Sequence, residues 1–328
     1  MTNIGIIGAG KIAGVMARTI RLMNEAGNTS VRLYGIASRS CQKAESFARE
    51  NGVEHAFSSY ELMVREPEIN LVYIATPHSH HYEHAKLCLA HGKHVLCEKA
   101  FTVNASQAKE IVKLAEEKRL LVAEGIWTRY QPMRKIINDI IFSGIVGEAK
   151  MLTANLGYEL TKKERVMKPE LAGGALLDVG VYALNFAEMI FGKADSVHAV
   201  CEKNEFGVDV NDSYTLIYEK ENRMAVLCAS ALARSDRYGM IHCTNGYIQV
   251  ENINNPQAVR VFDASYTLIK ELRCPPQLTG YEYEVIESCE AIAAGRTECV
   301  SMPHAEIVHM MELMDEIRRQ FGVQYQHE

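Results

Sequence analysis

Residues 3–13 constrain the fold of this chain more than any other feature. They read as an apolar run of β type, a turn that carries Gly8 and Gly10, and a helix with apolar residues at helical spacing. Gly8 permits a tight turn, Gly10 lets backbone N–H groups approach a pyrophosphate, and small Ala13 lets the helix pack closely on its strand. The same spacing also marks ordinary turns, but the strand before it and the helix after it favour a dinucleotide-binding opening.

Strands and helices alternate over residues 1–125. Apolar runs of β type predict strands at 31–38, 55–57, 71–75, 94–97 and 120–124, and helical spacing predicts helices at 40–51, 58–65, 82–91 and 104–118. Ser40 is placed to cap one helix, Gly92 to end another, and Asn104 with Gln107 to form a capping box. This alternation predicts right-handed parallel β-α-β units with a ligand crevice beyond the carboxyl ends of the strands.

The pattern changes after residue 125. Helices are predicted at 132–142, 179–191, 283–294 and 304–321, and strands at 150–156, 196–202, 213–218, 224–231, 237–244, 247–251 and 259–262. Asn245 and Gly246, between two of these strands, are a strong hairpin signal. Consecutive strands with short turns predict a mostly antiparallel open sheet with helices on one face. The other face, if uncovered, is a natural dimer surface.

The expected fold class is therefore α/β with two domains. We expect a dinucleotide-binding Rossmann domain with a doubly wound parallel sheet over residues 1–125. An α+β domain for substrate binding and oligomerisation is expected over residues 126–328. A length of 328 residues with 48% hydrophobic content supports two cores.

The composition of the chain limits the kinds of molecule that we expect it to bind. The net charge of −6 provides no basic field for nucleic acid, and no apolar stretch is long enough to span a bilayer. The nine cysteines contain no C-x-x-C pair, so we expect reduced residues and no zinc site. The first strand leaves no room for a signal peptide, so a cytoplasmic protein is expected.

The end of the second predicted strand bears on cofactor choice. An acidic residue at this place bonds the ribose 2′-hydroxyl and repels a 2′-phosphate, but this chain has Ala37, Ser38, Arg39 and Ser40. Hydroxyl groups and an arginine near a helix N-terminus form a reasonable phosphate clamp. The sequence therefore favours NADP over NAD, with an ordinary surface arginine as the alternative.

Three histidines, His78, His80 and His81, follow the predicted strand that ends at Ala75. They suggest a metal site, but consecutive positions point in different directions and a cofactor would occupy the space. We therefore favour packing and capping, with no metal.

Lys99 directly follows the strand predicted at 94–97 and Glu98, and would emerge at the crevice beside a nicotinamide ring. Partial burial and a cationic oxidised nicotinamide should both depress the pKa of its ammonium group, and Glu98 can orient it for acid-base work. The alternative is a solvated surface pair, and position alone does not decide between the two.

Gly173 and Gly174 open the most informative run of the second half. Asp178 and Tyr182 are four residues apart, so both project on one face if a helix begins here. The carboxylate could orient a substrate hydroxyl, and the phenol could donate or accept its proton. The alternative is a capping aspartate with a core tyrosine.

Taken together, these runs resemble the glucose-fructose oxidoreductase, inositol dehydrogenase and rhizopine-catabolism family, written Gfo/Idh/MocA. Residues 8–13, Ala75-Thr76-Pro77 with His81, Glu98-Lys99 and residues 173–182 stand in that family's order and spacing over essentially the whole chain. Residues 124–130 and 174–182 are most similar to the branch that contains dihydrodiol dehydrogenases and NADP-linked D-xylose dehydrogenases.

The resemblance implies catalytic roles for Lys99, Asp178 and Tyr182, which would also contact substrate beside Trp127 and Arg129. Trp127 could equally be an interdomain core residue. The resemblance implies cofactor contacts from Gly8, Gly10, Lys11, Ile12, Ser38, Arg39, Thr76, Pro77, His81 and Glu98.

Two positions depart from the family pattern. Ala100 stands where the family has proline, which removes a rigid backbone lock behind Lys99. His78 stands at a site that is often asparagine.

The implied activity is reversible hydride transfer between a nicotinamide cofactor, NADP preferred or NAD, and a hydroxyl-bearing carbon of a sugar, polyol or trans-diol. Lys99 and Tyr182 would exchange the hydroxyl proton while Asp178 aligns a substrate held between the domains. A homodimer or homotetramer through the C-terminal sheet is expected. The alternatives are a reductase of another substrate class and a non-catalytic NAD(P)-binding sensor, although a sensor is expected to lack the lysine or the aspartate.

Overall fold

A computed structural model describes residues 1–325, which form two compact units. The first contains Met1–Trp127 and Gln277–Met311; the second contains Thr128–Pro276 and the described residues from Glu312 onward. These units differ from the predicted ranges 1–125 and 126–328, because residues 277–311 belong to the first unit. There, helix α9 (Glu282–Ala293) packs beside α1 (Lys11–Glu25), and the hydroxyl groups of Thr19 and Thr279 are hydrogen-bonded at 2.7 Å.

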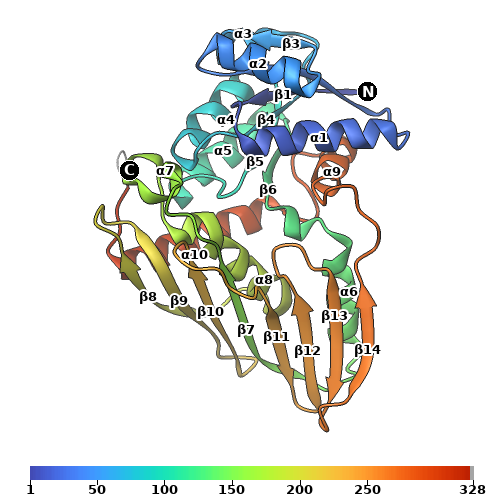
Figure 1. Cartoon of the computed structure of the whole chain (residues 1–328), viewed down its shortest axis with the longest axis vertical. Coiled ribbons are helices and arrows are strands. Elements are labelled where there is room, and N and C mark those ends of the chain that lie inside the picture. Colours follow the sequence, from blue (N-terminus) through green and yellow to red (C-terminus); the bar gives the residue numbers. More distant parts are fainter. Residues whose placement is uncertain (326–328) are drawn as a thin grey trace. The chain divides into compact units, whose positions relative to one another are not determined.

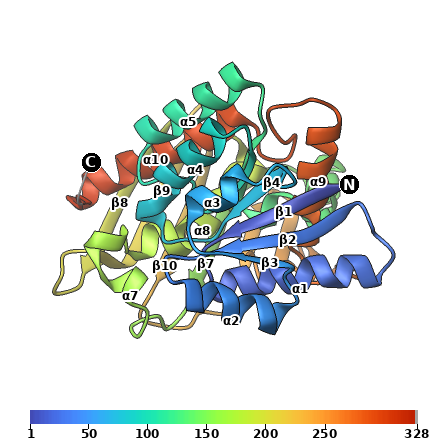
Figure 2. The same cartoon turned by 90° about the horizontal axis from the view of Figure 1, so that it is seen from above.

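The first unit contains a six-stranded parallel sheet in the order β3-β2-β1-β4-β5-β6. Figure 2 shows β3, β2, β1 and β4 side by side in this order. The strands are β1 (Thr2–Ile7), β2 (Val31–Ala37), β3 (His55–Phe57), β4 (Leu71–Ile74), β5 (His94–Glu98) and β6 (Val122–Gly125). The strand order reverses at β1, so the carboxyl ends of β1 and β4 flank a switch point where such sheets bind ligands. The predicted doubly wound sheet is confirmed.

Helices cover both faces of this sheet. Besides α1 and α9 they are α2 (Cys41–Asn51), α3 (Tyr60–Arg65), α4 (His81–Ala90) and α5 (Ala105–Lys118). Figure 2 shows α1 and α2 on one side of the sheet and α4 and α5 on the other. The predicted caps form, since Ser40 accepts the N–H of Lys43 and Asn104 accepts that of Gln107 at 2.9 Å. Gln107 accepts in return from Val103 rather than from Asn104, so the capping box is displaced by one residue.

The second unit contains an eight-stranded sheet in the order β14-β13-β12-β11-β7-β10-β9-β8 (Figure 1). The strands are β7 (Ala149–Gly157), β8 (Ser196–Lys203), β9 (Asp209–Tyr218), β10 (Arg223–Ser230), β11 (Gly239–Cys243), β12 (Gly246–Glu251), β13 (Ala258–Asp263) and β14 (Leu268–Arg273). Neighbouring strands are antiparallel except for the parallel pair β7 and β10. The predicted mostly antiparallel sheet is confirmed.

The helices of the second half are α6 (Pro132–Phe142), α7 (Glu164–Met167), α8 (Val181–Phe191) and α10 (His304–Phe321). A π-helical turn, Leu176–Gly180, leads directly into α8, where the sequence predicts an α-helix from residue 179. Among the described residues, Pro169–Phe191 is long and apolar enough to cross a membrane, but its most apolar stretch is 89% buried in the structure. It is therefore typical of a core helix.

Side chains of the second sheet alternate between a covered and an open face. Tyr214, Leu216 and Leu227 are buried, whereas Met224 and Val226 are 40% and 38% exposed. Helix α8 packs on the covered face over β7 and β10. The open face is the surface that the sequence analysis expects to form a dimer.

Two local predictions need correction. Cys243 pairs with Gly246, so the hairpin loop is Thr244–Asn245 and Gly246 begins β12 with a φ of +144°. Strand β14 is absent from the predicted strands. Nearly all residues of β14 are exposed, so no apolar alternation marks it.

Candidate functional site

The turn after β1 is shaped by the close approach of the backbone that follows β4. Gly8 has a φ of +100°, and a Cβ there would lie 3.0 Å from the carbonyl carbon of Ala75 and from Cγ2 of Thr76. Glycine is the residue that adopts this left-handed conformation without a side chain to fill that space. The predicted site residues Gly8 and Thr76 are thus brought together at the switch point.

Gly10 caps α1 without a side chain. No side-chain hydrogen bond caps this helix, and its first turn, which begins with exposed Lys11 and then Ile12, contains no acidic residue. A Cβ at Gly10 would meet only the carbonyl oxygen of Ala75, at 4.0 Å, among the described residues. Open space in front of the N–H groups of a helix N-terminus suits an anionic group.

Ser38 and Arg39 follow β2, with Ser38 buried and Arg39 exposed. Burial lowers the pKa of His80 and lowers that of His84 to about 4, and the nearby charge of Arg39 acts in the same direction on both. His84 Nδ1 also lies 3.0 Å from Thr76 Oγ1. After β2 and β4, the structure therefore brings together Arg39, the hydroxyl of Thr76 and the imidazoles of His80 and His84. The sequence predicts only Ser38 and Arg39 as a phosphate clamp at this place.

His81 is 1% exposed and bridges two backbone carbonyl groups. Its Nδ1 lies 2.9 Å from the oxygen of Ala100, and its Nε2 lies 2.8 Å from that of Thr76. Burial lowers the pKa of His81 to about 4, so the ring is neutral and its single N–H donates to one of these two carbonyl groups, while the other nitrogen only contacts the second. Among the residues that the structure describes, no group of three or more His, Cys, Asp and Glu side chains is placed to hold a metal.

Lys99 is half-buried at the carboxyl end of β5, and the backbone after it is held by two side chains. His81 contacts the carbonyl group of Ala100, and the N–H of Phe101 donates to Glu124 Oε1 at 3.1 Å. The Lys99–Ala100 peptide bond is cis. Neighbouring side chains thus hold the segment in which alanine replaces the expected proline.

A buried carboxyl group that the sequence analysis does not predict lies beside Glu98. Glu98 accepts the hydroxyl of Tyr73, and Glu284 Oε2 lies 3.6 Å from the position of a Cβ at Gly125. Glu284 is 0% exposed, and neither of its carboxyl oxygens has a hydrogen-bond partner among the described residues. Burial, followed by the charges of Glu98 and Glu282, raises the pKa of Glu284 well above its usual range, which favours its neutral form.

In the second unit, Asp178 occupies the π-helical turn and is 6% exposed. Arg165 of α7 contacts both of its oxygens, with Nη1–Oδ1 at 2.5 Å and Nη2–Oδ2 at 3.4 Å. A two-pronged guanidinium contact neutralises the carboxylate and fixes its orientation. Arg165 is not among the predicted site residues, because no local motif links it to Asp178.

Tyr182 lies near the start of α8 and is 8% exposed. Asn185 on the same helix is completely buried and donates to the carbonyl oxygen of Val181 at 2.8 Å. Its Oδ1 accepts from Arg129 Nε at 2.5 Å. Arg129 is thereby fixed to the helix that carries Tyr182.

Trp127 is 7% exposed and stacks on Tyr281 within the first unit. The ring centroids are 4.2 Å apart and the planes are inclined by 10°. This stacking joins the end of β6 to the start of α9.

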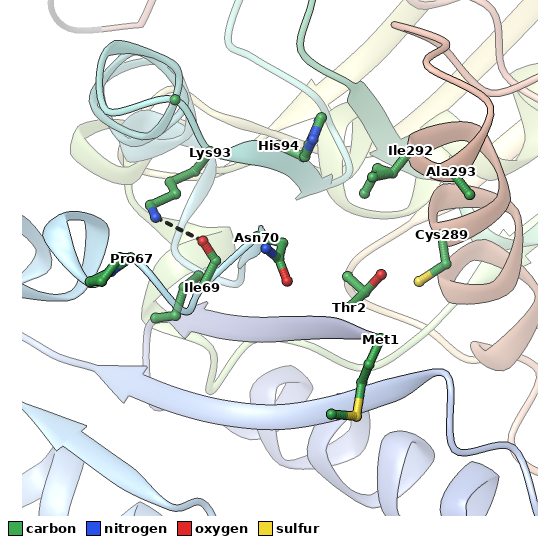
Figure 3. Close-up of a pocket in the computed structure, with 11 residues that line it drawn as sticks. Met1, Thr2, Pro67, Ile69, Asn70, Lys93, His94, Cys289, Ile292 and Ala293 are labelled. Carbon is green, nitrogen blue, oxygen red and sulfur yellow. Dashed lines mark hydrogen bonds between the residues drawn. The ribbon is translucent and has the colours of Figure 1, made fainter.

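A cavity of about 410 Å³ lies at the amino ends of the strands of the first sheet (Figure 3). It is lined by Thr2 at the start of β1, Asn70 before β4 and His94 at the start of β5, together with residues of α9. Lys93 Nζ, at its side, donates to two backbone carbonyl groups at 2.7 Å. Because this cavity lies at the amino ends of the strands, it is distinct from the predicted crevice at their carboxyl ends.

Two family models match the chain. The model described as "Oxidoreductase family, NAD-binding Rossmann fold" matches residues 2–126. The model described as "GFO/IDH/MocA C-terminal domain" matches residues 133–249.

Relatives and solved structures extend this similarity over the whole chain. The trans-1,2-dihydrobenzene-1,2-diol dehydrogenase of Xenopus tropicalis is 31% identical over 99% of both chains, and the human one is 28% identical over 98% of this chain and 97% of its own. A 3-ketoreductase from Actinomadura kijaniata, solved with NADP and TDP-benzene, has a TM-score of 0.86 at 21% identity over 98% of both chains. A levoglucosan dehydrogenase, solved with NADH and levoglucosan, has a TM-score of 0.86 at 19% identity over 98% of this chain and 97% of its own. The two solved structures support the fold.

We expect Gly8→Ala to lower the free energy of unfolding by about 2–5 kcal/mol, because alanine must adopt a left-handed conformation and press against Ala75. Gly27→Ala is the matched control, since Gly27 has a φ of +89° and no atom within 4 Å of a Cβ. Its loss should be about 1–2 kcal/mol, the conformational cost alone. Urea unfolding measures both, and equal losses would contradict a role for the close approach to Ala75.

Proposed function

This chain belongs to the Gfo/Idh/MocA oxidoreductase family, and we propose that it catalyses reversible hydride transfer between a nicotinamide cofactor and a hydroxyl-bearing carbon of a sugar, polyol or trans-diol. One observation carries this proposal. Lys99 is half-buried at the carboxyl end of β5, and His81 and Glu124 hold the backbone after it. A lysine fixed at this edge of a Rossmann sheet suits acid-base chemistry better than the role of a solvated surface group.

The glycine turn and the end of β2 fit a dinucleotide. The open space beside Gly10 and the uncapped start of α1 would receive the pyrophosphate. When bound, the nicotinamide ring supplies hydride chemistry. We propose NADP as the preferred cofactor and NAD as the second, held by Gly8, Gly10, Lys11, Ile12, Ser38, Arg39, Thr76 and Pro77, with buried His81 and Glu98 supporting this site.

Side chains that could bind hydroxyl groups, together with the named relatives, support the proposed substrate class. Asp178, oriented by Arg165, would accept a hydrogen bond from a substrate hydroxyl. Arg129 and Trp127, held by Asn185 and by stacking, would form walls of the pocket. The named relatives act on a trans-dihydrodiol, and a levoglucosan dehydrogenase shares the fold, so we propose a small polyhydroxylated or trans-diol substrate.

Lys99 and Tyr182 would move the proton of the oxidised hydroxyl. The O–H bond would break and its proton would pass to one of these two groups, while the C–H bond would break and its hydrogen would leave with both electrons as hydride, for which a bound nicotinamide would supply the acceptor. A carbonyl group forms on the substrate, and the reverse reaction returns the proton. Asp178 keeps the neighbouring hydroxyl in place throughout, so that the reacting carbon stays aligned.

We expect Lys99→Met to reduce kcat by about 10²–10⁴-fold, because it removes the group that exchanges the proton. Binding of NADPH, followed by its fluorescence, should not weaken. Lys113→Met, on the exposed face of α5, is the matched control and should leave kcat unchanged.

Turnover is measured as NADP⁺ and NAD⁺ reduction at about 340 nm with pentoses, hexoses, inositols and cyclic trans-diols. Unchanged turnover of Lys99→Met would exclude Lys99 from the reaction. A wild-type protein that binds NADPH but turns over no member of the panel would favour the sensor.

We expect Arg39→Gln to weaken NADPH binding by about 10–100-fold, the loss of a charge-assisted hydrogen bond to the 2′-phosphate. NADH binding should change by less than about twofold, since NADH carries no phosphate there. Arg49→Gln, at the other end of α2, is the matched control. If both cofactors lost affinity equally in Arg39→Gln, the assignment of Arg39 to the 2′-phosphate would be wrong.

We propose that the open face of the second sheet binds the same face of a second copy, giving a homodimer or homotetramer. Met151 pairs with Met224 and Thr153 with Val226 on adjacent strands, so partly exposed apolar side chains cluster there. A hollow of about 680 Å³ lies over this part of the sheet. An apolar sheet face of this kind suits a symmetric, self-complementary contact.

Val226→Lys should convert the assembly to a species of half the mass, because a symmetric contact would bury like charges. Light scattering coupled to gel filtration measures the mass. Val300→Lys replaces a valine that is 72% exposed in the first unit and should leave the mass unchanged. A monomeric wild type, or a Val226→Lys variant of unchanged mass, would contradict the proposed interface.

We also propose a cytoplasmic location. All nine cysteines of the chain are free thiols in the structure. A reducing compartment maintains such a set of thiols.

A further inference from the structure

Two buried carboxyl groups lie beneath the turn that carries Asp178, and the mechanism above does not use them. Asp209 and Asp212, both on β9, are 0% and 5% exposed. Asp209 Oδ2 accepts the N–H of Leu176 at 2.6 Å, at the first residue of the π-helical turn. Asp212 Oδ2 accepts the hydroxyl of Tyr214 at 2.6 Å.

A glycine at each end of the turn leaves room for a side chain of β9. Gly174 has a φ of +119°, and a Cβ there would collide with the carboxyl group of Asp209. A Cβ at Gly180 would come within 3.2 Å of the ring carbon Cζ of Tyr214. Asp178 thus lies between two places where β9 contacts the segment.

The carboxyl groups of Asp209 and Asp212 interact directly, and two carboxyl groups can form a hydrogen bond only when one of them carries a proton. The Oδ1 atoms of Asp209 and Asp212 find no N–H or O–H donor elsewhere in the described part of the chain. Asp209 already accepts a backbone N–H, so it is the ionised partner and Asp212 is the acid. Burial, followed by the charge of Asp209, raises the pKa of Asp212 to about 9.

We propose that Asp209, Asp212 and Tyr214 are positioning residues, in which one proton shared by the carboxyl pair holds the turn that carries Asp178. Tyr214 donates to Asp212, Asp212 donates to Asp209, and Asp209 accepts from Leu176. Loss of the proton leaves two facing carboxylates without a donor between them. Their repulsion releases the start of the turn, and Asp178 with it. The effect on activity rests on the proposed function.

Few other groups around the pair can titrate in the same range. On β8, Cys201 and Lys203 stand opposite Asp212 and Asp209, and on β10 the residue opposite Asp212 is Ala229. Burial raises the pKa of Cys201 to about 11, so this thiol keeps its proton when Asp212 loses its own.

On the strand itself, burial raises the pKa of Tyr214 well above its usual range. On residues 173–182 the charged side chain is Asp178, whose partner is Arg165 of α7, and the other titratable side chain is Tyr182.

Two substitutions at one position test the proposal. In Asp212→Asn, the amide N–H donates to Asp209 and the amide oxygen accepts from Tyr214, so the side chain imitates the protonated acid but cannot ionise. Asp212→Ala removes both bonds. Hydrogen exchange of the 173–182 segment at about pH 7.5 should match the wild type in Asp212→Asn and be at least about tenfold faster in Asp212→Ala.

The pH dependence of kcat/KM distinguishes a positioning role of Asp212 from a purely structural one. We expect kcat/KM to fall about 10–100-fold in Asp212→Ala and by less than about twofold in Asp212→Asn, with NADPH affinity unchanged in both. The wild type should lose kcat/KM above about pH 9, and Asp212→Asn should lack this loss. About one pH unit above the pKa of Asp212, the wild-type segment should also exchange faster than that of Asp212→Asn.

An alkaline loss of the same size in Asp212→Asn, or unchanged exchange in Asp212→Ala, would overturn the proposal. If Asp212→Ala does not fold, the comparison of the wild type with Asp212→Asn decides alone, since the exchange measurement needs no substrate. If exchange behaves as expected but the wild type turns over no sugar or diol, the proposed function fails and the positioning role stands.

Discussion

The backbone after β4 approaches the turn after β1 so closely that glycine is required there, and the site residues of the first unit depend on this contact. Gly8 faces Ala75, and the next residue, Thr76, contacts the ring of His81, which also reaches Ala100. A continuous set of contacts therefore runs from the glycine turn to the residue after Lys99. Because the strand order reverses at β1, these residues gather where an open parallel sheet binds its ligand.

The second unit, unlike the first, supplies its own acceptor for the N–H groups at the start of a helical turn. In both units a glycine segment precedes a helical turn whose first N–H groups need an acceptor. The space beside Gly10 is open, which suits an anion from outside the protein. The space beside Gly174 is filled by the carboxyl group of Asp209, which accepts the N–H of Leu176. An internal carboxylate thus takes the place that a phosphate would take at the first turn.

Local features of the fold could be predicted from the sequence, but the partners of the site residues could not. Periodicity and caps are properties of neighbouring residues, so the predicted bounds of α6 and α10 match the structure, whereas exposed β14 carries no such signal. Asp178 and Lys99 could be proposed because each belongs to a recognisable motif. Arg165 and Glu284 could not, because tertiary packing brings them to their partners from segments without a motif.

Two of the buried carboxyl groups that the sequence does not predict, Asp212 and Glu284, differ in what they can do. Asp212 donates to one partner and accepts from another, so it gives direction to a chain of hydrogen bonds, and an apolar replacement would leave Tyr214 and Asp209 without their partners. Glu284 has no hydrogen-bond partner among the described residues, so it orients no neighbouring group through a hydrogen bond. Its contribution is electrostatic. Burial favours its neutral form, which adds no second negative charge beside Glu98, and Glu98 itself accepts the hydroxyl of Tyr73.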